Sequence, residues 1–141
     1  MSEDYDLAFP TVDIVPYNSL TRNILLGKKS SQNGWRMIGG FFDVRQDRSF
    51  EDAAKRELFE EANIKVDKPQ YLFSSIVNDP RYIEKKDKII TSVFIAMYLS
   101  GYPIAGDDIA EVNWFHPDKL PEIVDEHKDF VKRIIKYLKQ N

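Results

Sequence analysis

The stretch from Ser49 to Asn63 constrains the fold of this chain most, because it carries the signals of a complete helix with two defined ends. Ser49 can cap the first turn, with Asp52 as its partner, and the run that follows is rich in Ala, Glu, Lys, Arg and Leu. Asn63 tolerates the left-handed conformation in which many helices end. We therefore expect a helix from Phe50 to Ala62.

One side of this helix gathers three glutamates. At about 100° per residue, Glu57, Glu60 and Glu61 fall within an arc of roughly 100°, on the side that also carries small apolar residues and points toward the protein body. Two carboxylates about 6 Å apart repel by roughly 3 kcal/mol at an effective dielectric of about 20, so a compensating cation is expected. The pattern favours a hard divalent ion such as Mg²⁺, and a solvated acidic face is the alternative that the helix alone leaves open.

Segments rich in β-branched and aromatic residues lie on both sides of the helix in the sequence. They predict strands at residues 11–17, 23–27, 71–77, 89–99 and 112–115, with the third and fourth paired. A polar loop at 28–34 leads through residues 35–38 to the adjacent glycines Gly39 and Gly40. Neighbouring glycines indicate a close approach of the backbone to another group.

The C-terminal segment predicts a second helix. Pro121 is expected to open it, and its apolar residues follow three-and-four spacing from Ile123 to Leu138. Strands interrupted by two helices fit an α/β fold in which a mixed sheet lies between helices. A chain of 141 residues with 43% hydrophobic residues is expected to form one domain over residues 1–141.

The composition narrows the range of functions. The chain has no cysteine, which excludes disulfides, thiolate catalysis and cysteine-type zinc sites. With 20 Lys and Arg against 23 Asp and Glu, the formal charge of −3 favours neither nucleic acid nor an anionic membrane as a partner. The acidic start has no apolar core of signal-peptide type, and no apolar run reaches about 20 residues. We expect a cytoplasmic protein.

The helix and the segment before it resemble the Nudix box, whose pattern is G-x5-E-x7-R-E-U-x-E-E-x-G-U, with U a bulky aliphatic residue. The second half matches as Arg56-Glu57-Leu58-x-Glu60-Glu61-x-Asn63-Ile64, with Asn in place of the closing Gly. The first Glu of the box falls on Gln46 when counted from Gly40 and on Arg48 when counted back from Arg56. The loop is therefore expected to be two residues longer and to lack that acid.

The lead-in from Trp35 to Gly40 is similar to the family's W-x-x-P-G-G, with Ile38 in place of Pro. The resemblance implies a Nudix-type α/β/α sandwich with a catalytic helix and a C-terminal packing helix. It also implies hydrolysis of a diphosphate bond with Mg²⁺, or Mn²⁺, as cofactor.

The resemblance assigns roles to individual residues. The implied metal ligands are the side chains of Glu57, Glu60 and Glu61 and the backbone carbonyl of Gly39. Glu60, Glu61 and Arg56 are the implied catalytic residues of the helix. Arg56 would orient the glutamates, and the alternative is that it pairs only with Asp52 on the helix surface.

In this family the general base often comes from a later loop, where Asp107, Asp108 and Glu111 are the available acids. Glu111 is the residue that we favour, and a solvated acidic turn is the alternative. The expected substrate-binding cations are Lys28, Arg36 and Arg81, with Lys29 as a further candidate. His116 and His127 are expected to be structural.

The sequence also indicates a class of substrate. Asn78-Asp79-Pro80-Arg81, followed by residues 87–91, is similar to Nudix domains that act on ADP-ribose. A nucleoside diphosphate linked to a second moiety, with ADP-ribose first, is therefore the expected small-molecule substrate. Hydrolysis of nucleoside triphosphates or dinucleoside polyphosphates is the first alternative, and a nucleotide-sensing module without catalysis is the second. Related ADP-ribose enzymes often build the pocket across a homodimer, which the sequence leaves open.

Overall fold

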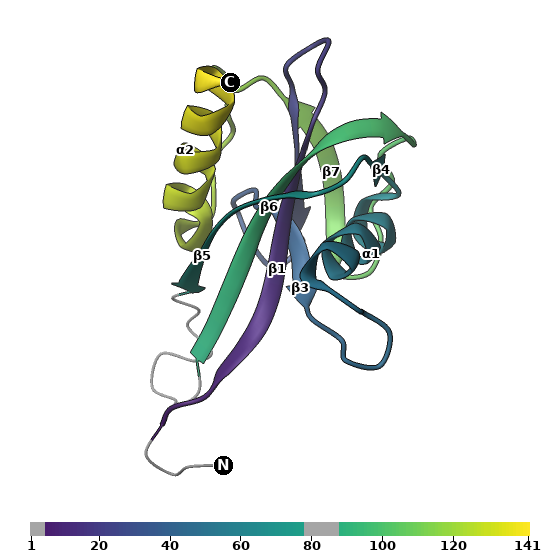
Figure 1. Ribbon diagram of the computed structural model, residues 1–141. Coiled ribbons are helices and arrows are strands. Elements are labelled where there is room, and N and C mark those ends of the chain that lie inside the picture. Colours follow the sequence, from purple (N-terminus) through teal and green to yellow (C-terminus); the bar gives the residue numbers. More distant parts are fainter. Residues whose placement is uncertain (1–4, 78–87) are drawn as a thin grey trace.

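The computed structural model describes residues 5–77 and 88–141, which form a seven-stranded sheet with one helix on each side (Figure 1). The segment 78–87, which carries Arg81 and most of the tract similar to ADP-ribose enzymes, lies outside the described residues. The strands are β1 (Ala8–Tyr17), β2 (Ile24–Lys29), β3 (Ile38–Phe41), β4 (Lys65–Val66), β5 (Gln70–Val77), β6 (Lys88–Ser100) and β7 (Ile109–Phe115).

The sheet is mixed, as expected, and β1 runs through its centre. β1 pairs in parallel with β6 on one side and antiparallel with β3 and β2 on the other. β2 continues the sheet to β7, while β6 also carries β4 and β5 in antiparallel pairing. The predicted pairing of the strands near 71–77 and 89–99 is confirmed. Gly39 and Gly40 lie inside strand β3, opposite Asp13 and Val12 of β1.

Helix α1 (Phe50–Ala62) has the ends that the sequence predicts. The Ser49 side chain accepts a hydrogen bond from the Asp52 backbone N–H at 3.1 Å. Asn63 ends the helix in the left-handed region, at φ 60° and ψ 33°, and its N–H bonds to the Phe59 carbonyl at 3.0 Å. Local chemistry therefore sets both ends of this helix.

Helix α2 (Asp125–Gln140) begins four residues after Pro121, so the predicted start of this helix is wrong. The reason is a contact distant in sequence: Ile123 forms a β-bridge with Trp35, and the Val124 N–H bonds to the Trp35 carbonyl at 2.9 Å. These bonds hold the segment extended until Asp125. Neither helix of the described chain has the length and apolarity needed to cross a membrane.

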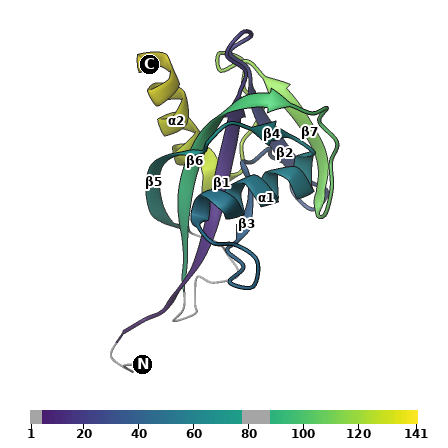
Figure 2. The ribbon, with the colours of Figure 1, turned by 45° about the vertical axis from the view of Figure 1, so that its right-hand side comes forward.

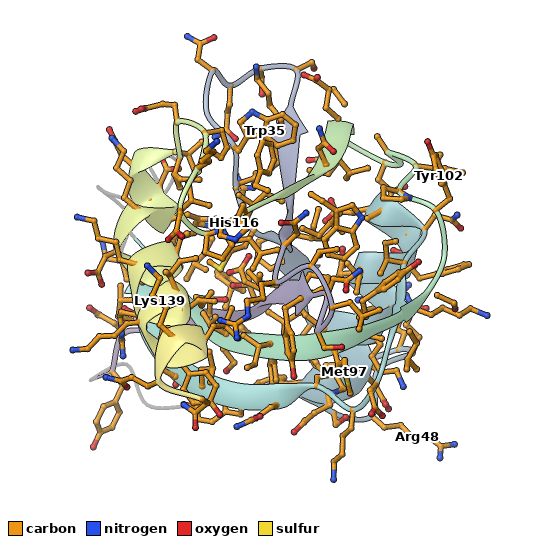
Figure 3. All side chains as sticks on the ribbon, turned by 90° about the horizontal axis from the view of Figure 1, so that it is seen from above. Trp35, Arg48, Met97, Tyr102, His116 and Lys139 are labelled. Atoms are coloured by element: carbon orange, nitrogen blue, oxygen red, sulfur yellow. The ribbon has the colours of Figure 1, made fainter. Side chains whose placement is uncertain are left out.

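The two helices cover opposite faces of the sheet, which confirms the α/β/α sandwich (Figures 1 and 2). Successive residues of a strand point to opposite faces, so Ile14 packs under α1 while Val15 packs under α2. Phe94 and Ile95 of β6 divide in the same way. Seen from above, side chains fill the space between the sheet and both helices (Figure 3). The candidate site lies on the α1 side, where β3 passes beneath the helix.

Candidate active site

The glycine pair of β3 lies between two carboxylates. A Cβ on Gly40 would approach the Glu57 carboxylate to 2.6 Å, which is closer than side chains pack. A Cβ on Gly39 would overlap the Val12 carbonyl oxygen and approach Asp13 Oδ1 to 2.5 Å. The expected close approach at the glycine pair is therefore present on both faces of the strand. Only glycine allows β3 to run this close to α1 and β1 together.

Arg56 ties the helix to the loop that precedes it. Its Nε and Nη2 donate to the two carboxylate oxygens of Asp47, each at 2.8 Å, and Nη2 also donates to the Phe41 carbonyl at 3.2 Å. Nη1 donates to Glu57 at 2.9 Å and to Glu60 at 3.2 Å. The alternative of a simple surface pair with Asp52 is thus not what the structure shows. The planar guanidinium instead joins three carboxylates and the end of β3.

Asp47 corrects the expectation that this loop lacks an acid at the first half of the box. The two ways of counting point to Gln46 and Arg48, and the acid lies between them. Its carboxylate is buried, and the hydrogen bonds from Arg56 hold its pKa below the usual range. Arg48 points outward at the edge of the molecule (Figure 3). Counting residues missed Asp47, although it is the single acid among residues 44–48 and could have been chosen on that ground.

Glu61 is the buried member of the glutamate group. Its side chain lies under β3, where Oε1 accepts a hydrogen bond from the Gly39 N–H at 3.2 Å. Burial, a hydrogen bond to Asp108 and the nearby charge of Glu57 together raise the pKa of Glu61 to about 8. A carboxyl group with such a pKa holds its proton at neutral pH unless a cation takes the place of that proton.

The other two glutamates differ in exposure. Burial raises the pKa of Glu57, although Arg56 acts against this shift. The side chain of Glu60 is 40% exposed, against 13% for Glu57. The prediction that all three glutamates point toward the protein body is therefore wrong for Glu60, which lies at the rim. At about 100° per residue Glu60 lies at the edge of the arc, on the far side of Glu57 from Glu61, while Glu57 and Glu61 face the glycine pair.

The loop between β6 and β7 brings a further acid to this place. The Ile104 and Gly106 N–H groups donate to the Ala62 and Glu61 carbonyls, at 3.0 and 2.9 Å. These bonds use the carbonyls left open at the end of α1. They set Asp108 beside Glu61, and the hydrogen bond from Glu61 and the charge of Lys29 outweigh burial and lower the pKa of Asp108.

Glu111, the residue favoured from the sequence as general base, lies farther out. Its side chain is 60% exposed, and its carboxylate is 4.0 Å from Lys28 Nζ. Asp108, by contrast, contacts Glu61 directly. The sequence could not separate the two acids, because the folding back of the 101–108 loop on α1 decides which of them meets the helix. The structure therefore brings Asp108, not Glu111, to the glutamates.

Two lysines of β2 lie along the same edge, and Arg36 contacts the 28–34 loop. Lys29 Nζ is 3.2 Å from Asp108 Oδ2, and its side chain is 26% exposed. Lys28 lies beside Glu111, and Arg36 Nη1 donates to Gln32 Oε1 at 3.1 Å. Lys29 was only a further candidate in the sequence, yet it has the shortest link to the acidic group. Arg81 cannot be placed, because it lies outside the described residues.

The donor chemistry fits a hard divalent ion, since several carboxylates crowd one place. Within residues 5–77 and 88–141, however, no three acidic or histidine side chains already surround one point as metal ligands. Arg56 is one reason why the carboxylates do not converge, because its guanidinium forms ion pairs with Glu57 and Glu60. The site thus has the right donors, two of which are held by a protein cation.

Comparison with known proteins decides the family. The profile of the NUDIX domain matches residues 8–134, which is most of the chain. The chain belongs to the Nudix family. The matched range contains the glycine pair, α1 and the loop with Asp108.

Individual relatives agree with this assignment. An ADP-ribose pyrophosphatase of Methanocaldococcus jannaschii is 31% identical over 101 residues, covering 70% of this chain and 56% of the relative. An oxidized purine nucleoside triphosphate hydrolase of Mus musculus is 29% identical over 106 residues, covering 71% of this chain and 62% of the relative. This Nudix chain thus matches less than two thirds of the length of each. The Nudix domain of Shewanella oneidensis NrtR, solved with ADP ribose, shares the fold with a TM-score of 0.75 at 19% identity, covering 98% of this chain and 93% of that one.

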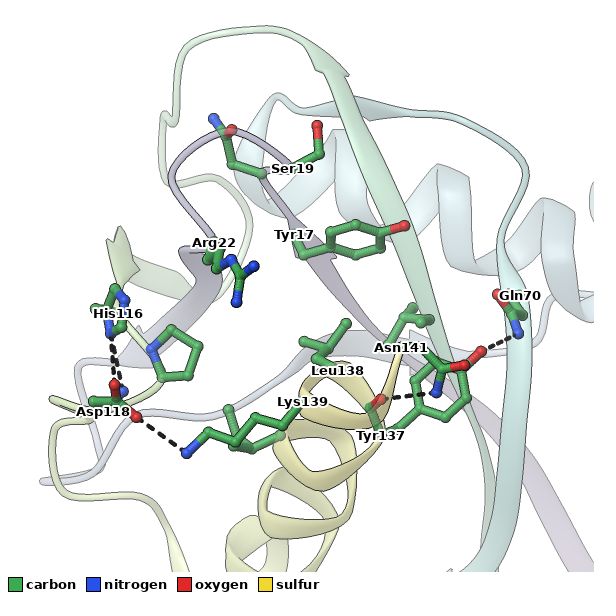
Figure 4. Close-up of a pocket in the computed structure, with 14 residues that line it drawn as sticks. Tyr17, Ser19, Arg22, Gln70, His116, Asp118, Tyr137, Leu138, Lys139 and Asn141 are labelled. Carbon is green, nitrogen blue, oxygen red and sulfur yellow. Dashed lines mark hydrogen bonds and ion pairs between the residues drawn. The ribbon is translucent and has the colours of Figure 1, made fainter.

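The Nudix protein also has a cavity of about 690 Å³ far from the glutamates. It lies on the α2 side, beyond the end of β1 at Tyr17, and is lined by residues of the β1–β2 turn, the segment after β7 and the last turns of α2 (Figure 4). Within it, Asp118 pairs with Lys139 at 3.0 Å and with His116 at 3.7 Å. None of the predicted site residues that the structure describes lines this cavity, so its size does not make it the reaction site.

Proposed function

We propose that this Nudix protein is a pyrophosphohydrolase that cleaves the diphosphate bond of a nucleoside diphosphate linked to a second moiety, with ADP-ribose as the first substrate to test. The observation that carries the proposal is the acidic group formed by Glu57, Glu61 and Asp108 against the glycine pair. The relative named as an ADP-ribose pyrophosphatase supports the choice of substrate.

The same acids are suited to hold the cofactor. Glu57, Glu60, Glu61 and the Gly39 carbonyl would supply oxygen ligands to Mg²⁺, with Mn²⁺ as a substitute. When bound, the ion would neutralise the diphosphate and make its phosphorus more electrophilic. Metal binding requires Glu61 to release the proton that it holds because of its raised pKa. It also requires Glu57 and Glu60 to break their ion pairs with Arg56 and to bind the ion instead.

Other residues of the chain would act on the substrate and the water. Lys29 and Lys28 lie at the edge of the site, where a diphosphate would need positive charge, and Arg36 stays a predicted substrate-binding cation. Asp108 lies between Glu61 and Lys29, which supports it as the acid that would accept a proton from the attacking water. Arg56 keeps α1 and the 43–48 loop in register through Asp47. Hydrolysis of ADP-ribose would yield AMP and ribose 5-phosphate.

A panel of substrates tests the proposal. Purified protein would be incubated with ADP-ribose, nucleoside triphosphates and dinucleoside polyphosphates, in Mg²⁺ and separately in Mn²⁺, and the products separated by chromatography. We expect AMP and ribose 5-phosphate from ADP-ribose, and no products after chelation of the metal. If ADP-ribose is not hydrolysed, it is not the substrate.

The alternatives give other products. The mouse relative, named as a nucleoside triphosphate hydrolase, favours triphosphates as the second candidate, and these would release a monophosphate and pyrophosphate. Tight binding of intact ADP-ribose after long incubation with metal would instead indicate a sensing module. A homodimer stays a prediction, and light scattering during size exclusion would measure it.

A further inference from the structure

Behind the glycine pair, on the α2 side of the sheet, three buried polar side chains meet. Asp13 of β1, Thr91 of β6 and His127 of α2 are 6%, 0% and 3% exposed. The Thr91 hydroxyl donates to Asp13 Oδ2 at 2.6 Å, and His127 Nδ1 accepts a hydrogen bond from the Met37 N–H at 3.0 Å. We call these three residues the buried polar cluster. The proposed reaction uses none of them.

The cluster has a defined protonation state. Because Nδ1 of His127 accepts a hydrogen bond, its proton lies on Nε2, which is 4.0 Å from Asp13 Oδ1. Burial lowers the pKa of His127 to about 4, so the ring is neutral near pH 7. The contact with Asp13 is therefore between an N–H dipole and a carboxylate. No lysine or arginine among the described residues forms an ion pair with Asp13, and a buried acid of this kind is costly where apolar packing would suffice.

Asp13 lies directly against β3. It is the ladder partner of Gly39, and its Oδ1 would be 2.5 Å from a Cβ at that position. His127 holds the residue two places before Gly39 through the Met37 N–H. The cluster therefore contacts β3 at Gly39 and the chain directly before β3 at Met37, one contact on each side of Ile38.

On the opposite face of the same strand stand the proposed metal ligands. The Gly39 N–H donates to Glu61 at 3.2 Å, and Gly40 packs on the Glu57 carboxylate. A shift of β3 by a few tenths of an ångström would thus move the Gly39 carbonyl and both glutamate contacts together. The strand has the buried polar cluster behind it and the acidic group in front.

We infer that the buried polar cluster is a positioning device, which sets the place of Gly39 and Gly40 so that the acidic group can bind its cation. The inference rests on the proposed function for the identity of that cation. Asp13, which Thr91 of β6 holds by a hydrogen bond, sets the position of Gly39 against β1. His127 links the residue before β3 to α2. Groups that support ligands in this way change metal affinity by about 10–100-fold when they are removed.

Glycine-selective NMR can observe the positioning without any metal. The sequence has six glycines, and the Ile38-Gly39 and Gly39-Gly40 dipeptides each occur once, so pairwise isotope labelling identifies both amides. The variants are Thr91→Val, which removes a hydroxyl at nearly constant volume, His127→Leu, which removes both ring nitrogens, and His127→Asn, whose amide oxygen can replace Nδ1 as acceptor. Ile134→Val is the matched control, because Ile134 is fully buried on the same helix and belongs to the apolar core under α2.

The expected result has two parts. Thr91→Val and His127→Leu shift the Gly39 and Gly40 amide resonances, leave that of Gly101 in place, and weaken Mn²⁺ binding, measured by electron paramagnetic resonance, by about 10–100-fold. His127→Asn restores part of the affinity. Ile134→Val lowers the melting temperature without moving either glycine resonance or the Mn²⁺ affinity.

Two outcomes would contradict the inference. If Thr91→Val and His127→Leu lower stability while the glycine resonances and the Mn²⁺ affinity stay unchanged, the cluster serves stability alone. If His127→Leu does not fold, Thr91→Val still decides the question. Failure of the wild-type protein to bind Mn²⁺ or to cleave any substrate of the panel would count against the proposed function, whereas the metal-free glycine resonances would still report whether the cluster positions β3.

Discussion

At the scale of single residues, the site depends on carboxylates whose surroundings give them different properties. Glu61 is buried and holds its proton to about pH 8, while Asp108 beside it has a lowered pKa. A hydrogen bond joins the two, so one proton serves both groups. A divalent cation would replace that proton. Substitutions that keep the shape of these side chains but remove their charge are therefore the most direct tests.

Replacing Glu61 by Gln should lower kcat by at least about 100-fold, since the loss of groups that only support a metal ligand already costs about 10–100-fold. Glu51→Gln, ten residues earlier on the same helix, is the control and should retain the wild-type rate. Steady-state kinetics with ADP-ribose and circular dichroism would measure activity and folding. If Glu61→Gln has a near-normal kcat, Glu61 does not take part in the reaction.

Asp108→Asn and Glu111→Gln form a second matched pair. Because Asp108 contacts Glu61 and Glu111 lies at the surface beside Lys28, we expect Asp108→Asn to lower kcat by about 100-fold and Glu111→Gln to lower it less than about threefold. The rates would be compared at saturating Mg²⁺. The reverse order of effects would restore Glu111, the residue favoured from the sequence, as the base.

Residue by residue, the sequence predicted what is local and missed what depends on distant contacts. Arg56, Glu57 and Glu61 follow from the box pattern, because one helix carries all of them. Asp47 was missed because counting assumes a loop of fixed length, and here the guanidinium of Arg56 selects the acid. Asp108 could not be distinguished from Asp107 and Glu111 in the sequence, because the bonds between the 101–108 loop and the end of α1 decide which acid lies at the site.

At the scale of elements, the two helices differ in how far the sequence determines them. Both ends of α1 were predicted correctly, because Ser49 and Asn63 act within one turn. The start of α2 was not, because the bridge between Ile123 and Trp35 overrides the preference of Pro121 for a first helical turn. Five of the strands were found with shifted ends. β3, which contains the glycine pair, and β4, which has two residues, were not predicted as strands.

Asn63→Ala tests the end of α1. The left-handed conformation at φ 60° costs a residue with a Cβ roughly 1–2 kcal/mol, and Asn63 also donates from Nδ2 to the Tyr102 carbonyl at 3.1 Å. We expect Asn63→Ala to lower the free energy of unfolding by about 1–2 kcal/mol and Asn63→Gly to lower it less. Urea denaturation would measure both. Equal losses in the two variants would show that the side-chain hydrogen bond, not the backbone, dominates.

His127 makes the attachment of α2 depend on pH. Its pKa is about 4 in the folded protein and about 6.5 in an unfolded chain, so the unfolded state takes up a proton first as the pH falls. The stability that His127 contributes is complete above pH 6.5 and is lost toward pH 4, by on the order of 3 kcal/mol. We expect the difference in unfolding free energy between wild type and His127→Asn to shrink over this range. A difference that does not vary with pH would contradict the lowered pKa.

At the scale of the whole molecule, the acidic group trades stability for the capacity to bind a cation. Burial of the carboxyl groups of Glu57 and Glu61, together with nearby like charges, opposes folding in the absence of metal, and a bound ion would reverse this effect. The fold class was predicted at this scale, since strands interrupted by two helices fit a mixed sheet that lies between helices. The pairing order of the strands was not, because it depends on contacts between distant segments.

Mg²⁺ should therefore stabilise the protein. At 100 times its dissociation constant, an ion that binds only the folded state adds about 2.7 kcal/mol, which should raise Tm by roughly 5–10 °C. Differential scanning calorimetry would measure this, with KCl at equal ionic strength as control. In Glu61→Gln we expect a higher Tm than wild type without metal and a smaller rise with it. A similar rise with KCl would mean that screening alone accounts for the effect.

The loop at 101–108 is bonded to the carbonyls of the last turn of α1 as well as to the strands that it connects. Because the loop is bonded to α1, a tilt of this helix would move Asp108 of the loop together with the glutamates of α1. The spacing between these carboxyl groups would then be preserved. An insertion of one residue in this loop would break its hydrogen bonds to the end of α1 without removing any of the acidic residues. Homologous chains with longer connections here would need another tether to keep a comparable centre intact.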